Sequence, residues 1–392
     1  MPAIPVKFFS HDMLGAPQLS GSAGALIAVL DACLLTGFNV RVPSSFVIAG
    51  GVGTLTFATA PGYIKHQVIA VAGADSAQYN TTWRVTGISG ATITVDAAGV
   101  ADATVASAGG LSARVAPLGW QKAFSGVNLA AYKSGAADAT GCLLRVDDAT
   151  ATYASVRGYE TMSDIDTGIG MFPTVAMRAT SAWPKSGAAS SAPRQWTLVG
   201  DDRFIYLVVH TEYDSLVAFP NHRCGVFFGD PIAYKAGDTY HAALSSIAVT
   251  AANQVGSEGQ GNILHLGYDM GSANNRFVLA RSFTQVGSAI WAAFVGSTSR
   301  SGDNTLSAYP NPGDNSLILG KMKLIVESAA RAVRGELPGF YTCLQARPLT
   351  HGNLVEDVVP GRILMTIGTS TEQGYGYDYS TRWMLDITGP WR

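Results

Sequence analysis

The hydrophobic pattern of the chain follows a helical period in one long stretch, residues 20–37, and an alternating period in most other segments. In the sequence SGSAGALIAVLDACLLTG, Leu26, Leu30 and Cys33 form one apolar stripe, and further leucine and isoleucine positions widen it. Asp31 is the only charged residue of the stretch, so the pattern predicts a long helix that is buried rather than half solvated.

Small residues mark both ends of this predicted helix. Ser20 or Ser22 is expected to cap its start, because a serine oxygen accepts hydrogen bonds from the unpaired amides of the first turn. Gly37 stands where a residue of positive φ commonly ends a helix. Before the helix, residues 1–19 hold three prolines and are expected to form an extended arm or a first strand.

Residues 47–116 alternate between apolar and polar positions over several short segments. Five to six strands at this spacing predict a small antiparallel barrel or sandwich, inserted into the main fold. The clearest alternating segments are residues 54–57, 68–71, 83–86 and 91–95.

The pattern of residues 117–392 also predicts mainly strands and turns. Two strands are expected around the turn Gly200-Asp201-Asp202, and the second is so continuously apolar that we expect it to be covered on both faces. Residues 236–262 are small and polar, which predicts a long loop. The fold class expected is mainly β: a multi-stranded antiparallel sandwich or barrel core, one long buried N-terminal helix and an inserted small β module.

The domain organisation expected from these patterns has three segments. Residues 1–46 form the N-terminal arm and buried helix, which belong to the main domain. Residues 47–116 form the inserted β module, and residues 117–392 form the main β-rich domain.

Three sets of residues resemble a known family. Tyr79-Asn80 and TWRVT (82–86) are similar to a small β module that recurs in tailed-phage structural proteins. The segment GWQKAFSGVNLAAYKS (119–134) and the pair RGELPG (334–339) and DITGPWR (386–392) resemble a family of tailed-bacteriophage virion structural proteins of the tail or baseplate type. The resemblance implies a structural role in the virion and brings no catalytic residues with it.

The composition agrees with a protein that is covered by neighbours. Charged residues make up 14% of the chain, and 44 glycines are present, whereas about 25% charge is usual. Such a sparsely charged surface suits an assembled particle, although a compact β protein with small side chains on its turns is an equal alternative. Four scattered cysteines, expected to be buried free thiols, form neither a zinc motif nor a disulfide framework.

The charge and hydropathy patterns also exclude several classes of partner. The net charge is −2 and basic residues are scattered, so we expect no nucleic-acid binding. No apolar run reaches the roughly 18 residues of a spanning helix, so we expect no membrane insertion. The start MPAIPVKFFSHDM lacks the pattern of a signal peptide. We therefore expect the protein to stay in a cytoplasm or to leave it by a route that needs no signal, as a virion assembled in the host cytoplasm does.

Two polar clusters contain residue types that could bind a metal ion. His210 and Glu212 would share one strand face, with Asp214 and His222 beyond, but a metal needs three or four converging ligands and a polar strand end is the favoured interpretation. The DxDxG pattern that begins at Asp164 lacks the later ligands of a calcium loop, so a polar turn is favoured.

Two further groups of residues have the chemistry of catalysis or of sugar binding. Glu160 with Asp164 or Asp166 could form a glycosidase carboxylate pair, although nothing in the sequence fixes the distance between the carboxyl groups. The tyrosines of residues 374–379 could stack on sugars, but packing at an interface is the favoured interpretation. Neither a serine-hydrolase GxSxG motif nor a complete phosphate-binding loop is present.

The sequence therefore predicts a structural component of a tailed-phage virion, most simply of the tail or baseplate, and not an enzyme. We expect no catalytic, cofactor-binding or metal-ligating residues and no cofactor. The expected partners are other virion proteins and further copies of the chain, in a ring or trimer. The alternatives are a fibre-type protein that recognises host surface glycan, through residues 300–316 and 374–379, and a polysaccharide hydrolase.

Overall fold

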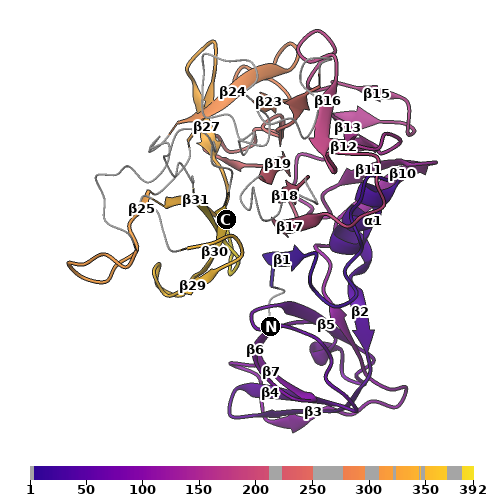
Figure 1. Ribbon diagram of the computed structural model, residues 1–392, viewed down its shortest axis with the longest axis vertical. Helices are drawn as coiled ribbons and strands as arrows, with labels where there is room; N and C mark the ends of the chain where they lie inside the picture. Colours follow the sequence, from indigo (N-terminus) through magenta and orange to yellow (C-terminus); the bar gives the residue numbers. More distant parts are fainter. Residues whose placement is uncertain are drawn as a thin grey trace.

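The computed structural model describes residues 4–211, 223–249, 277–295, 309–320, 324–343, 345, 349–368 and 382–392. Within these residues the fold is mainly β, with several sheets and one helical segment near the N-terminus, as the hydrophobic pattern predicted. Every strand pairing that the structure describes is antiparallel. Figure 1 shows the indigo and purple N-terminal sheet at one end of the molecule and the remaining sheets at the other.

The N-terminal sheet, which we call the β module, has eight strands in the order β2-β9-β5-β6-β7-β4-β3-β8. Because β2 and β3 follow each other in the chain yet stand near opposite ends of this order, the sheet curls on itself. Its strands are β2 (Phe38–Arg41), β3 (Pro43–Ala49), β4 (Val52–Phe57), β5 (Val68–Ala72), β6 (Thr82–Ser89), β7 (Thr92–Asp96), β8 (Ala103–Thr104) and β9 (Ser112–Val115).

The alternating residues of the module point in and out as the sequence predicted. Phe46, Leu55, Trp83 and Ile93 are completely buried, and the rings of Phe46 and Trp83 meet edge to face at 5.2 Å. The sheet includes β2, and β3 already begins at Pro43, so it starts before residue 47 and has more strands than predicted. The division of the chain into three segments itself stays a prediction.

A ten-stranded sheet forms the centre of the remaining chain, in the order β1-β17-β18-β19-β21-β23-β24-β26-β27-β20. The N-terminal arm supplies its first strand, β1, and the predicted hairpin around residues 200–202 supplies β17 and β18. Every residue of β18 is buried, as its apolar run predicted. The strands are β1 (Lys7–Ser10), β17 (Gln195–Gly200), β18 (Phe204–His210), β19 (Arg223–Gly229), β20 (Ile232–Ala233), β21 (Ala243–Leu244), β23 (Phe277–Leu279), β24 (Ile290–Val295), β26 (Leu324–Glu327) and β27 (Val333–Glu336).

Three smaller sheets complete the fold. A six-stranded sheet contains β10 (Gln121–Gly126), β11 (Leu129–Lys133), β12 (Leu143–Asp147), β13 (Tyr153–Tyr159), β16 (Ser181–Pro184) and β22 (Ile247–Ala248). A five-stranded sheet contains β25 (Leu319–Gly320), β28 (Phe340–Cys343), β29 (Leu354–Glu356), β30 (Ile363–Gly368) and β31 (Arg382–Asp386). A pair is formed by β14 (Thr161–Met162) and β15 (Gly168–Ile169), and η2 (Ala77–Tyr79) is a short 3₁₀ turn.

The predicted loop at 236–262 is wrong for its described part, residues 236–249. Strands β21 and β22 lie there, and between them Ser245 and Ser246 are completely buried. The hydroxyl of Ser245 accepts from the amide of Phe227 at 2.7 Å, and the side chain of Arg178 donates to Ser246. The serines are therefore internal hydrogen-bonding partners, which composition alone could not distinguish from loop residues.

The helix has a different start from the one predicted. It consists of α1 (Ala25–Asp31), which continues as one π-helical turn, η1 (Ala32–Thr36). Gly24 precedes it at φ 79°, and neither Ser20 nor Ser22 caps it. Instead Oδ2 of Asp148 accepts from the amides of Leu26 at 2.7 Å and Ile27 at 3.1 Å. A carboxylate suits the positive end of a helix better than a hydroxyl, so the cap comes from a distant turn.

The end of the helix agrees with the sequence, and its apolar stripe is buried, whereas Ala28 and Thr36 are exposed. Gly37 ends it at φ 70°, and a Cβ at this position would lie 2.1 Å from the carbonyl oxygen of Val115. Leu26, Leu30 and Cys33 are completely buried. The glycine is therefore required both by the backbone and by the close approach of β9.

Candidate functional site

The predicted metal cluster at the end of β18 can be followed only in part. His210 and Thr211 are buried there, whereas Glu212, Asp214 and His222 lie outside the described residues. Among the residues that the structure describes, no group of three or more His, Cys, Asp or Glu is placed to hold a metal ion.

The acidic segment that begins at Asp164 forms a polar turn. Oδ1 of Asp164 accepts from the amides of Asp166 and Thr167, both at 2.8 Å, and the backbone bond from Asp166 contributes most to lowering the pKa of this exposed carboxyl. Asp166 in turn pairs with Arg145 at 2.9 Å. Both carboxylates therefore stabilise the turn and its attachment to β12.

Glu160 is held in a bidentate ion pair. Nε and Nη2 of Arg281 donate to its two oxygens, each at 2.6 Å, and the same guanidinium lies 4.0 Å from the ring centre of Tyr240. Both oxygens of the Glu160 carboxylate are therefore engaged by one guanidinium. The tyrosines of residues 374–379 lie outside the described residues.

A second ionic cluster, formed by Arg334, Asp238 and Glu327, lies buried in the ten-stranded sheet. Nη2 of Arg334 contacts Asp238 at 2.5 Å and Nη1 contacts Glu327 at 2.6 Å, and the three side chains are at most 4% exposed. Glu327 also accepts from the amide of Phe283 at 2.6 Å. The sequence pattern RGELPG contains this arginine, but the two acidic partners come from separate segments.

Arg84 joins the β module to the rest of the molecule. Its guanidinium donates to the carbonyl oxygens of His66 and Ile387, both at 3.0 Å, of Thr388 at 3.1 Å and of Val6 at 3.4 Å. Burial lowers the pKa of Arg84 to about 10. One side chain therefore connects the N-terminal arm, the module and the segment that follows β31.

A second link between the module and the five-stranded sheet is ionic and more exposed. Oε1 of Glu356 accepts from Lys65 at 2.8 Å and lies 2.9 Å from Nε2 of His66. Hydrogen bonds from Lys65 and His66 lower the pKa of Glu356, whereas burial lowers the pKa of His66. Since the carboxylate is solvated, we expect this link to contribute little stability by itself.

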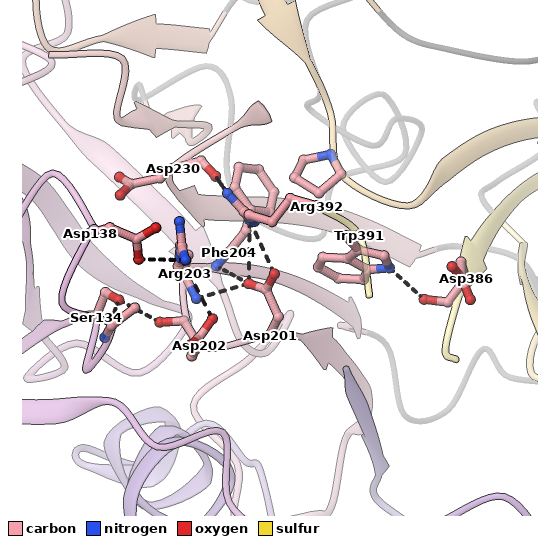
Figure 2. Close-up of polar contacts among 12 residues, drawn as sticks. Ser134, Asp138, Asp201, Asp202, Arg203, Phe204, Asp230, Asp386, Trp391 and Arg392 are labelled. Carbon is pink, nitrogen blue, oxygen red and sulfur yellow. Dashed lines mark hydrogen bonds and ion pairs between the residues drawn. The ribbon is translucent and has the colours of Figure 1, made fainter. Parts of the chain in front are cut away.

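Trp391 is buried, and the side chain of Arg392 is held by partners from other segments. Figure 2 shows Arg392 between Asp201 and Asp230: it donates to Oδ2 of Asp201 at 3.1 Å and to the carbonyl oxygen of Asp230 at 2.8 Å. The indole of Trp391 donates to the carbonyl oxygen of Asp386 at 2.9 Å.

Asp201 is central to this region because it also orders the β17–β18 turn. Its Oδ1 accepts from the amides of Arg203 at 2.8 Å and Phe204 at 2.7 Å. Arg203 forms a further ion pair with Asp138. The polar residues gathered in Figure 2 thus fix strand ends and the last residues of the chain to one another, and the interactions described are internal to the fold.

The outward side of β3, β4 and β7 forms a surface with little charge, which we call the outer face of the module. Val47 lies opposite Thr54, which lies opposite Thr94, so these side chains form a row across the three strands. The two most exposed valines here, Val47 and Val52, are 38% and 45% exposed. Along the outward positions of these strands the single ionisable residue is Asp96.

Sequence reasoning missed most of the residues that join the parts of the molecule. Arg84 and Arg392 lie in segments that were singled out for their resemblance, but their carbonyl and carboxylate partners follow from no local pattern. The expected state of the cysteines is confirmed: all four are buried and free. No helix among the described residues is both long and apolar enough to cross a membrane.

No family model and no curated protein matches the chain. Among solved structures it is similar to a phage phi92 endosialidase, with a TM-score of 0.17 and 10% sequence identity over 90% of this chain. The chain covers 52% of that protein, about half of its length. A similarity of this size does not establish a shared fold.

Proposed function

We propose that this protein is a structural component of a tailed-phage virion, of the tail or baseplate, which acts by symmetric assembly and not by catalysis. The resemblance of RGELPG, DITGPWR and the module to phage virion proteins supports the virion role. In the fold, Arg84 of the module contacts the carbonyl oxygens of Ile387 and Thr388, so two of these segments are in direct contact.

The outer face of the module is the observation that carries the assembly role. It spans adjacent strands, exposes β-branched side chains and holds almost no charge. Depletion of charge is typical of the buried centre of a protein–protein interface. The low charge of the whole chain, 14%, suits a protein whose surface is covered in this way.

The test is the mass of the purified chain in solution. We expect light scattering to give a defined multiple of 40.9 kDa, with rings or trimers in negative-stain images. Replacement of Val47 or Thr54 by Lys places a charge on the outer face and is expected to shift the mass towards the monomer. The matched control is Val127→Lys, because Val127 is 88% exposed in a turn outside the module.

The outcomes distinguish the surface used for assembly from assembly as the function. A multiple that survives both Val47→Lys and Thr54→Lys would show that assembly uses another surface. A wild-type chain that remains a monomer, alone and when mixed with particles that lack it, would contradict assembly as its function.

A further inference from the structure

Lys185 and Asp148 form an ion pair in which both side chains are completely buried. Nζ of Lys185 contacts Oδ1 of Asp148, and each side chain is 0% exposed. Lys185 directly follows β16, and Asp148 lies in the turn between β12 and β13. Burial of two opposite charges is costly before their attraction is counted. The complete burial of this pair therefore needs an explanation beyond simple ion pairing.

The hydrogen bonds around this carboxyl group favour nucleophilic attack on its carbon atom, Cγ of Asp148. The other carboxyl oxygen, Oδ2, accepts from the amides of Leu26 at 2.7 Å and Ile27 at 3.1 Å. Two backbone amides that point at one oxygen form the arrangement that stabilises the oxyanion of a tetrahedral intermediate. A second hydrogen bond, from Nζ to the carbonyl oxygen of Ser22 at 2.7 Å, holds the amine beside the carboxyl group.

Burial favours the neutral form of the carboxyl group, which such a reaction needs. Burial raises the pKa of Asp148, although its bond to Lys185 opposes this. In a site without solvent, transfer of one proton from the ammonium to Oδ1 removes both charges and leaves an amine next to a carboxylic acid. The amine is held at the acid throughout, so the reaction is intramolecular and its entropic cost has been met by folding.

We propose that Lys185 and Asp148 condense to an isopeptide bond that links the β12–β13 turn covalently to the end of β16. The nitrogen lone pair of Lys185 attacks Cγ of Asp148, and Oδ2 carries the negative charge against the amides of Leu26 and Ile27. The C–Oδ1 bond then breaks, and this oxygen leaves as water with the protons from the nitrogen. The step loses one water molecule, involves no oxidation or reduction and needs no other reactant.

The proposal is tested by mass spectrometry of the intact, denatured full-length chain. We expect a mass below that of the sequence by one water molecule, and proteolytic digestion should give one branched peptide that contains both Lys185 and Asp148. The variant Lys185→Arg should keep the full mass. The variant Asp148→Asn should lose ammonia in place of water, whereas Asp147→Asn, at the neighbouring carboxylate, should still lose water.

Each outcome decides the proposal. A wild-type chain of full mass would show that the contact is an ion pair only, and this result does not depend on whether any variant folds. A loss of water without the branched peptide would point to cyclisation of an aspartate and would equally overturn the cross-link. Because the readout is chemical, it is independent of whether the protein assembles.

Discussion

Arg84 donates to the carbonyl oxygen of Ile387 across 303 positions of sequence, at 3.0 Å. These residues belong to TWRVT and DITGPWR, two of the segments singled out in the sequence. The partly buried guanidinium donates to four carbonyl oxygens, and these hydrogen bonds do not depend on the protonation of acids.

Replacement of Arg84 by Met should therefore weaken the attachment of the module. Four carbonyl oxygens lose a donor, and we expect the free energy of unfolding to fall by about 2–3 kcal/mol, measured by urea unfolding. The control is Arg114→Met on β9, where the arginine is exposed, and its effect should be close to zero. Equal effects of the two variants would show that Arg84 is no more important than a surface arginine.

Replacement of Arg334 by Met should destabilise the ten-stranded sheet more strongly. It leaves Asp238 and Glu327 buried without their cation, a change that typically costs about 3–5 kcal/mol. The triple variant that adds Asp238→Asn and Glu327→Gln removes the charges and should recover part of the loss. Thermal unfolding checks both, and a triple variant less stable than Arg334→Met would contradict this explanation.

Gly339 and Gly352 provide a matched pair of glycines with positive φ, 61° and 83°. A Cβ at Gly339 would lie 2.1 Å from Nε1 of Trp391, whereas one at Gly352 has no atom within 4 Å. Gly352→Ala should cost only backbone strain, about 1 kcal/mol. Gly339→Ala should also displace the indole and cost about 3 kcal/mol or more. Similar melting temperatures for the two variants would show that Trp391 has room to move.

The stability of the protein should fall as the pH is lowered past the usual pKa of histidine. Burial, together with the charges of Arg223, His11 and His210, places the pKa of His351 well below its ordinary value of 6.5. The unfolded chain therefore binds the proton first, and stability present above about pH 6.5 is lost below it, by up to about 1.4 kcal/mol per pH unit.

Urea unfolding between about pH 7 and about pH 5 measures this dependence. His351→Asn should reduce the slope, while His11 and His66, whose pKa values are also lowered, retain the rest. Thr197→Val removes the partner at 3.1 Å from His351 but not the titrating group, so its slope should match the wild type. An unchanged slope in His351→Asn would contradict the assignment.

Local patterns in the sequence were sufficient for the strands and for the end of the helix. The alternation of residues such as Leu55 and Ile93 predicted which side chains enter the module core, because neighbouring strand positions point to opposite faces. The turn at Asp201 followed from polar residues between two apolar runs, and Gly37 was the expected helix end. Each of these depends on residues close together in the chain.

The start of the helix and the ionic clusters were beyond such reasoning. Ser20 and Ser22 have the chemistry of caps, but Asp148, 122 positions away from Leu26, takes that role. Arg334 and Asp238 meet across 96 positions. Fully buried charges have no signature in the sequence that distinguishes them from surface charges, since only the tertiary fold decides which segments they join.

The close approach of Gly37 to Val115 has a consequence for the evolution of such a protein. The chain enters and leaves the β module at adjacent points, since Phe38 pairs with Val115 in the register of β2 and β9. A unit whose two ends meet can be exchanged without moving its flanking segments apart. Exchange of the module would alter the exposed surface of the molecule, and it would also remove the contacts of Arg84 with Ile387 and Thr388.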